Sequence, residues 1–254
     1  MSQIALNNPD PDVLDGRHIR AAAFEGAQRE LLDLLPLPAS ATDATPRALT
    51  VGAGYSWLPH LIASAGYQVS AIDSSAEATA VASSNTAEVA ADIDFRVGEV
   101  TSLPAPDASF DLVWCIDTLE TTDDPHGVLA ELARVRRPSG ALVLDTVSDT
   151  WLSRLIYLRL FQQVPGTRIM PPGRYTTDRL RTPAFLAEAV GRINLEIAEI
   201  HGYEPASPQT LLSALLRRRR GKLTDAELAE AAGFTLSEPG HEPPVTYFAI
   251  ARPA

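Results

Sequence analysis

Two glycines and one aspartate have the types and the spacing needed to hold an adenosine-containing cofactor. Gly52 and Gly54 lie where a short apolar run gives way to a helical pattern, and Asp73 ends the next apolar run. Glycines allow a tight turn and let a ligand approach backbone amides, while a carboxylate ending the second strand can accept both ribose hydroxyls of an adenosine. The three residues therefore predict a site for an adenosine cofactor.

Trp57 separates two classes of such cofactor. A dinucleotide-binding turn needs a further glycine three positions after the second, so that the helix N-terminus can approach a pyrophosphate. This chain has Trp57 at that position, which argues against NAD. A tight turn beside a surface aspartate is the non-functional alternative, and the place of Asp73 at a strand end favours the cofactor site over it.

The elements that must position these residues alternate between strands and helices. Apolar runs predict strands at 48–52, 68–72, 93–96, 110–115 and 140–147, and apolar residues at helical spacing predict helices at 18–35, 56–65, 75–86 and 125–135. Asp124 before Pro125 is a typical helix start, and Ser74 with Glu77 is a candidate capping box. This alternation predicts βαβ units and a mostly parallel sheet.

Beyond residue 147 the pattern changes. A largely apolar helical segment is predicted at 151–164, a proline-rich loop at 165–174, a helix at 183–191 capped by Thr182, and strands at 194–204 and 245–252. We expect an α/β, Rossmann-like, doubly wound fold with a mostly parallel seven-stranded sheet, an antiparallel C-terminal strand pair and a helical cap. Its expected parts are an N-terminal extension and cap helix (1–47), a cofactor-binding core (48–147), a helical lid (148–192) and C-terminal strands (193–254) with a helical insertion (207–243).

Composition limits the partners. The formal net charge of -11 and the pI near 4.9 argue against nucleic acid. Cys115 is the only cysteine, which excludes a disulfide within the chain and is typical of a reducing compartment. No apolar run approaches a membrane span and the first 14 residues do not resemble a signal peptide, so we expect a cytoplasmic protein that is not integral to a membrane. The five histidines lack metal-ligand spacing, so we expect no metal.

Downstream motifs carry a resemblance to a known family. In order along the chain they are Gly98–Pro104, Phe110–Cys115, Leu119-Glu120, Asp124-Pro125 and Leu132–Gly140. Together they resemble the motifs of class I S-adenosylmethionine-dependent methyltransferases. Further segments at Pro165–Thr167, Thr182-Pro183, Gly202–Pro205 and Val245–Tyr247 are similar to ubiquinone-biosynthesis O-methyltransferases and their natural-product relatives. The resemblance extends over about residues 17–252, apart from 207–244.

This resemblance implies a role for individual residues toward S-adenosylmethionine. The implied cofactor residues are Gly52 and Gly54 for the methionine part, Asp73 for the ribose, Ser74, Glu99 and Val100 for the adenine, Cys115 and Ile116 for the sulfur end, and Arg20 or Arg17 as the arginine that the family supplies from its N-terminal helix.

Three positions depart from the family pattern. Thr50 stands where the family usually has an acidic residue, Ser56 where it often has a third glycine, and Thr121 where relatives have a histidine suited to act as the base. Threonine cannot accept a proton at neutral pH, so another residue acts as base or none is needed. The candidate bases are Glu120, His201 and His18.

The expected activity is O-methylation of a small hydrophobic acceptor, such as a secondary metabolite or a quinone precursor. Two alternatives stay open: an S-adenosylmethionine-binding enzyme that catalyses cyclisation or isomerisation, and a non-enzymatic binding protein. The apolar segment 151–161 is either core or a lid over the acceptor. Arg217–Arg220 with Lys222 mark a solvated helix end or a contact with anionic lipid, and the sequence is compatible with a homodimer.

Overall fold

A computed structural model describes residues 17–35, 45–52, 54–85, 93–165 and 167–254. Its strands are β1 (Arg47–Val51), β2 (Gln68–Asp73), β3 (Ile93–Val97), β4 (Phe110–Cys115), β5 (Arg136–Val147), β6 (Leu195–Glu204), β7 (Thr235–Leu236) and β8 (Thr246–Pro253). Its helices are α1 (Arg17–Leu34), α2 (Leu58–Ser64), α3 (Ala76–Asn85), α4 (Pro125–Val135), α5 (Trp151–Ser153), the π-helical η2 (Arg154–Leu160), the 3-10 helix η3 (Thr177–Arg179), α6 (Pro183–Gly191), α7 (Pro208–Arg219) and α8 (Asp225–Ala232).

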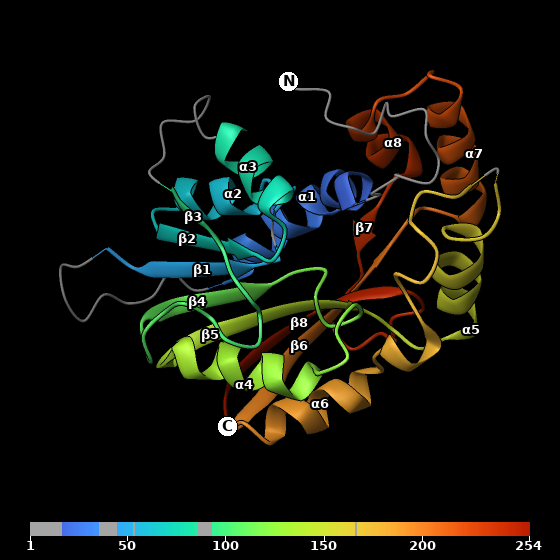
Figure 1. Ribbon diagram of the computed structural model, residues 1–254. Coiled ribbons are helices and arrows are strands. Elements are labelled where there is room, and N and C mark those ends of the chain that lie inside the picture. Colours follow the sequence, from blue (N-terminus) through green and yellow to red (C-terminus); the bar gives the residue numbers. More distant parts are fainter. Residues whose placement is uncertain (1–16, 36–44, 53, 86–92, 166) are drawn as a thin grey trace.

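The strands form one sheet in the order β3-β2-β1-β4-β5-β8-β6-β7 (Figure 1). The strands β1 to β5 pair in parallel, and β8 lies antiparallel between β5 and β6. The predicted Rossmann-like class is therefore confirmed. Its strand number differs, because the two-residue strand β7 pairs with the end of β6 and adds an eighth strand to the expected seven. A strand this short carries no periodic signal in the sequence.

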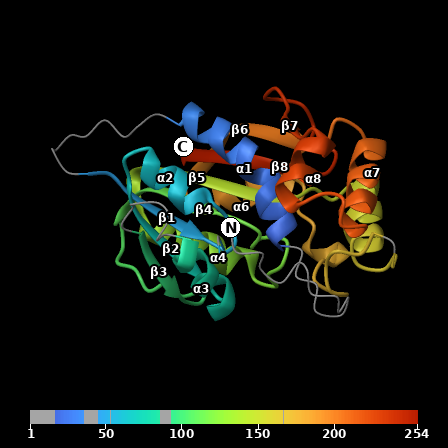
Figure 2. The ribbon, with the colours of Figure 1, turned by 90° about the horizontal axis from the view of Figure 1, so that it is seen from above.

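The sheet is covered on both faces, as expected for strands that are buried almost throughout. Helices α1, α2 and α3 lie over one face, and α4 and α6 lie over the other (Figures 1 and 2). Side chains alternate between these faces, so neighbouring residues of one strand belong to different cores: Cys115 packs with α4 and α6, whereas Trp114 packs with α1 and α2.

A third apolar cluster lies at the end of the molecule where α5, η2, α7 and α8 gather (Figure 2). It joins the start of α1 to η2 and to the two helices of the 207–243 segment, through Ile19, Ile156, Leu211 and Leu228. The predicted helices of this region are present, although half of the predicted 151–164 helix, Arg154–Leu160, is π-helical. No helix within the described residues is long and apolar enough to cross a membrane.

Helix starts follow the side chains that cap them. The Asp124 carboxylate accepts a hydrogen bond from the Gly127 amide at 2.8 Å and Thr182 caps α6 as predicted. The start of α3 differs by one residue. Ser75 accepts from the Ala78 amide at 3.2 Å, so the cap is Ser75 and the predicted Ser74 lies exposed outside the helix. The two serines are adjacent, and only the backbone conformation decides between them.

The packing of α1 yields a matched pair of variants. Leu31 is fully buried in the core between α1 and the sheet, whereas Leu34 of the same helix is 51% exposed. We expect Leu31→Ala to lower the free energy of unfolding by about 2–5 kcal/mol and Leu34→Ala to change it by no more than about 0.5 kcal/mol. Urea unfolding of both variants measures this. Equal losses would contradict the placement of α1 on the sheet.

Candidate active site

The turn after β1 is shaped by contacts that only glycine permits. Gly52 has a φ of +78°, and a Cβ there would lie 2.1 Å from the Ile116 carbonyl oxygen. A Cβ on Gly54 would lie 2.4 Å from the Ala78 side chain. The turn is therefore held close against the end of β4 and the start of α3, and side chains are excluded from it.

Asp73 ends β2 beside this turn and is 5% exposed. Its Oδ2 accepts from the Gly54 amide at 3.0 Å and its Oδ1 accepts from the Ser75 amide at 2.8 Å. The nearest cation is Arg17 of α1, whose Nη1 lies 3.8 Å from Oδ1. A carboxylate has about four acceptor positions, so after these two amides Asp73 can still accept from two hydroxyls.

A cleft of about 310 Å³ lies between this turn and α1. It is lined by Arg17, Arg20, Ala21, Phe24, Gln28, Gly52, Tyr55, Ser56, Ile116 and Asp117. Gln28 is fully buried. Its Oε1 accepts a hydrogen bond from the Ser56 hydroxyl at 3.2 Å, and the Nε2 of Gln28 has no hydrogen-bond partner among the described residues. An unpaired buried donor beside a glycine turn fits the carboxylate of the methionine part of S-adenosylmethionine. The residues present therefore fit this cofactor.

The residues implied for the adenine and the sulfur lie in different places. Ser74 and Glu99 are exposed and Val100 is half-buried. The segment after β2 and the segment after β3 are held together by the Gly98 amide, which donates to the Asp73 carbonyl at 3.1 Å. Ile116 lines the cleft. Cys115 does not line it, because its side chain belongs to the core on the opposite face of the sheet, where burial raises the pKa of the thiol. The side chain of Cys115 therefore does not face the cleft, and a place for the cofactor's sulfur end near residues 115 and 116 stays a prediction.

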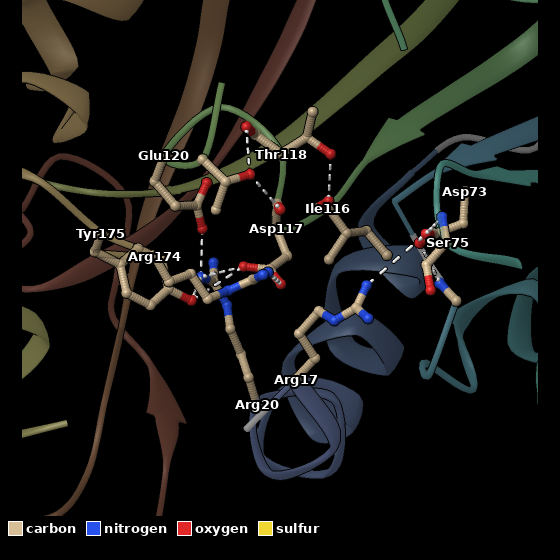
Figure 3. A network of polar contacts seen from close by, with 12 residues as sticks. Arg17, Arg20, Asp73, Ser75, Ile116, Asp117, Thr118, Glu120, Arg174 and Tyr175 are labelled. Atoms are coloured by element: carbon tan, nitrogen blue, oxygen red, sulfur yellow. Dashed lines mark hydrogen bonds and ion pairs between the residues drawn. The ribbon is translucent and has the colours of Figure 1, made fainter. Parts of the chain in front are cut away.

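Arg20 lies at the centre of a buried ionic cluster (Figure 3). Its Nη1 donates to Asp117 Oδ1 at 3.0 Å and pairs with Glu120 Oε1, and its Nη2 donates to Asp145 Oδ1 at 3.0 Å. Arg174 donates to the other Asp117 oxygen at 2.5 Å. The cluster thus joins α1, the ends of β4 and β5, and the segment before η3. Arg20 lines the cleft, but both of its terminal nitrogens are already held by carboxylates.

Burial and charge act in opposite directions within this cluster. Burial raises the pKa of Asp145 to about 8, although Arg20 opposes the shift, and burial likewise raises the pKa of Glu120. Burial also acts on Asp117, but Arg174 and Arg20 outweigh it and hold the pKa of that carboxyl below its usual value. The two arginines therefore favour the charged form of Asp117, whereas burial disfavours the charged forms of Glu120 and Asp145.

An apolar cavity lies on the other side of Arg20 and Phe24, and the space between its lining atoms, including the part open to solvent, is about 600 Å³. It is lined by residues of α1, η2, the 169–170 segment, β6, α7, α8 and β8, and the polar side chains among its lining residues are those of Arg20, Tyr157, Tyr203 and Thr246. The Tyr157 hydroxyl lies 3.1 Å from Thr246 Oγ1. Arg20 and Phe24 line both hollows, so the cleft and the cavity share one wall.

The three candidate bases do not meet at one point. Glu120 is fully buried and pairs with Arg20. His201 lies on β6, where its Nδ1 contacts the Ser237 carbonyl at 3.1 Å and its Nε2 contacts Glu199 Oε2 at 3.2 Å; it lines neither the cleft nor the cavity. The end of β6 borders the cavity through Tyr203, but His201 itself does not line it, and its role as a base stays a prediction. The His18 side chain lies outside the described residues.

Asp117 and Gln28 are site residues that the sequence did not indicate. Asp117 has a φ of +46°, a left-handed conformation that is uncommon for residues other than glycine and is frequent at functional sites. The sequence gives Gln28 no distinguishing neighbour, since its role depends on where α1 packs. No group of three or more His, Cys, Asp and Glu side chains in the described part of the chain could hold a metal ion.

The close packing of the glycine turn predicts that one methyl group added at Gly52 weakens cofactor binding. Gly52→Ala places a Cβ against the backbone at Ile116 and at a positive φ, so we expect its dissociation constant for S-adenosylmethionine to rise at least about tenfold. Calorimetry measures this. The control is Gly26→Ala on α1, where a Cβ meets nothing within 4 Å and affinity should not change. Unchanged affinity in a folded Gly52→Ala variant would exclude this turn as the cofactor site.

Comparison with known proteins identifies the family. Residues 49–144 match the family model described as "Methyltransferase domain". A ubiquinone biosynthesis O-methyltransferase from Xanthomonas axonopodis pv. citri is 31% identical over 198 residues, which cover 75% of this chain and 82% of that protein. One from Xanthomonas oryzae pv. oryzae is 32% identical over 174 residues, 67% of this chain and 72% of that protein.

Solved structures share the fold. A possible histamine N-methyltransferase from Thermotoga maritima aligns with a TM-score of 0.59 at 15% identity, covering 94% of this chain and 92% of that one. Magnesium protoporphyrin IX methyltransferase from Synechocystis with bound SAH aligns with a TM-score of 0.59 at 16% identity, covering 94% and 86%.

These findings confirm the predicted family, activity class and cofactor, S-adenosylmethionine, and they do not favour the non-methylating or non-enzymatic alternatives. Because it is 31% identical to a relative of which it covers 82%, the chain belongs to the S-adenosylmethionine-dependent methyltransferase family that includes the ubiquinone biosynthesis O-methyltransferases.

Proposed function

We propose that this methyltransferase transfers the methyl group of S-adenosylmethionine to an oxygen of a small hydrophobic acceptor held in the apolar cavity. The observation that carries the proposal is the shared wall: Arg20 and Phe24 line both the cleft beside the glycine turn and the cavity. Methyl transfer from a sulfonium is an in-line displacement, so two adjoining sites that align donor and acceptor supply much of the acceleration.

The cleft would hold the cofactor through five kinds of contact. Gly52 and Gly54 leave room for the methionine part, Gln28 donates to its carboxylate, Asp73 accepts from the ribose hydroxyls, and Ile116 lies against the sulfur end. Ser74, Glu99 and Val100 border the adenine. When bound, the cofactor supplies an electrophilic methyl group. Thr50 is fully buried with no hydrogen-bond partner for its Oγ1 among the described residues, and it leaves the cofactor ammonium without the acidic partner that relatives have.

The cavity would select the acceptor by its apolar surface. Segment 148–192 supplies Tyr157, Phe161 and Met170 as one wall, and the 207–243 insertion supplies a facing wall through Leu211, Leu215 and Leu228. We infer that both segments act as the substrate cover. The names of the relatives support transfer to oxygen and a quinone precursor or a related secondary metabolite. A cytoplasmic location, a homodimer and peripheral lipid contact remain predictions from the sequence.

The cofactor assignment predicts the effect of removing the carboxylate of Asp73. Hydrogen bonds to charged groups contribute about 1.5–3 kcal/mol each, so Asp73→Ala should raise the dissociation constant for S-adenosylmethionine at least about tenfold. The loss of binding free energy should exceed any loss in the free energy of unfolding. Calorimetry and thermal unfolding measure the two effects. Asp94→Ala on the edge strand β3, whose carboxylate pairs with Arg96 in solvent, is the matched control. Loss of binding in both variants would remove the special role of Asp73.

The acceptor assignment predicts the effect of filling the cavity. Ile169→Trp adds volume inside the cavity, so we expect the KM for an acceptor that the enzyme methylates to rise at least about tenfold. The affinity for the cofactor should stay unchanged. The acceptor is first found by mass spectrometry in a panel of phenols and hydroxylated quinones. Leu155→Trp, at a 41% exposed position outside the cavity lining, is the control. A folded Ile169→Trp enzyme with an unchanged KM would place the acceptor elsewhere.

A further inference from the structure

Arg20 has one donor that the ionic cluster does not use. Its two terminal nitrogens are held by three carboxylates, yet its Nε is buried and has no hydrogen-bond partner among the described residues. Other buried arginine Nε atoms among the described residues also have no hydrogen-bond partner, but a buried donor is stabilised when a ligand accepts from it, and Arg20 alone among these arginines lines the two hollows. The Nε of Arg20 belongs to the residue that lines both hollows, at the place where donor and acceptor must meet.

The surroundings of the guanidinium favour an anion. Its carbon lies 4.8 Å from the centre of the Phe24 ring and 6.0 Å from that of Tyr157, so the group is held between two rings at the end of an apolar cavity. Asp117 pairs with two guanidinium groups, those of Arg20 and Arg174. Burial raises the pKa of both Glu120 and Asp145 and so disfavours their charged forms, which lowers the negative charge around Arg20 and favours an anion there.

We propose that the acceptor binds as an oxyanion, a carboxylate or an acidic phenolate on an apolar body, which accepts a hydrogen bond from Arg20 Nε at the junction of the two hollows. This proposal rests on the proposed function, because it names the acceptor class for the same site. The observation that carries it is one unused donor on the arginine that lines both the cofactor cleft and the apolar cavity.

The reaction then needs no general base. An electron pair of the oxyanion forms the new bond to the methyl carbon, the carbon–sulfur bond breaks with its pair remaining on sulfur, and the positive charge of the sulfonium is lost. The products are a neutral methyl ester or ether and S-adenosylhomocysteine, and no proton is released. This accounts for Thr121 in place of a histidine and for His201 lying outside both hollows.

The same arrangement makes anion binding depend on pH. The titratable groups that face Arg20 or its carboxylate partners are Arg17, Cys115, Asp117, Glu120, Asp145, Tyr157, Arg174, Tyr175, Arg181 and Tyr247. Burial raises the pKa of the thiol and of the three tyrosines, so these groups stay neutral. Asp145 loses its proton as the pH rises through about 8, and the negative charge it gains should weaken binding of an anion.

Pairs of charged and neutral probes test the proposal. Calorimetry with S-adenosylhomocysteine present compares 2-naphthoate with 2-naphthamide, and 2,4-dinitrophenolate with 2,4-dinitroanisole. We expect the anion of at least one pair to bind at least about tenfold more tightly than its neutral partner at neutral pH. The pair that shows the preference identifies a carboxylate or a phenolate acceptor. Affinity for the anion should fall at least about tenfold between about pH 6.5 and about pH 9.5, a range in which the probe itself stays ionised.

Variants assign the effect to the cluster. Arg20→Lys keeps the positive charge but removes Nε, so the preference for the anion should fall at least about fivefold, while Arg29→Lys on the exposed side of α1 should leave it unchanged. Asp145→Asn keeps a side-chain acceptor for Arg20 and removes the titration, so its affinity for the anion at high pH should exceed that of the wild type at least about fivefold. This variant and the wild-type pH series still decide the question if Arg20→Lys does not fold.

Equal binding of the charged and neutral probes by the wild type would overturn the oxyanion assignment. If both probes still bind and Ile169→Trp weakens them, the acceptor cavity of the proposed function stands. If neither probe binds at any pH, while S-adenosylhomocysteine does, the cavity itself is wrongly assigned and both proposals fail together.

Discussion

The buried guanidinium of Arg20 is the interaction on which the site depends. Through ion pairs with Asp117, Glu120 and Asp145 it connects α1 to the carboxyl ends of β4 and β5. These ion pairs help to position the helix that lines the cofactor cleft. Removing one partner of a buried ionic group typically costs about 3–5 kcal/mol, because the remaining charges stay buried without compensation. Apolar contacts of Phe24 and Leu31 also hold α1 on the sheet, and the cluster adds a polar link between the helix and the carboxyl ends of β4 and β5.

The position of α1 in turn determines both hollows. One side of the helix, between Arg17 and Gln28, lines the cleft beside the glycine turn, and Ile19, Ala23 and Phe24 line the cavity that η2, α7 and α8 complete. The cofactor side of the site is built from short, tightly constrained contacts around Gly52 and Asp73. The acceptor side is built from apolar side chains of segments outside the βαβ core, which can change without disturbing the sheet.

Local signals in the sequence were sufficient for the fold and for the cofactor turn. Apolar runs, helix caps and the spacing from Gly52 to Asp73 are all properties of neighbouring residues. The centre of the site could not be predicted in this way, because Arg20 meets Asp117 and Asp145 across 97 and 125 residues of chain. The same limit applies to two other residues. The face of β4 to which the Cys115 side chain belongs, and the partners that His201 has on β6, depend on the assembled sheet.

The most direct test of this account is a crystal structure of the protein with S-adenosylhomocysteine and 2-naphthoate. The account predicts the cofactor sulfur beside Ile116, the naphthalene ring in the apolar cavity, and a carboxylate oxygen within hydrogen-bond distance of Arg20 Nε. Naphthoate bound elsewhere, or bound in the cavity with its carboxylate directed away from Arg20, would contradict the claim that this arginine joins the two sites.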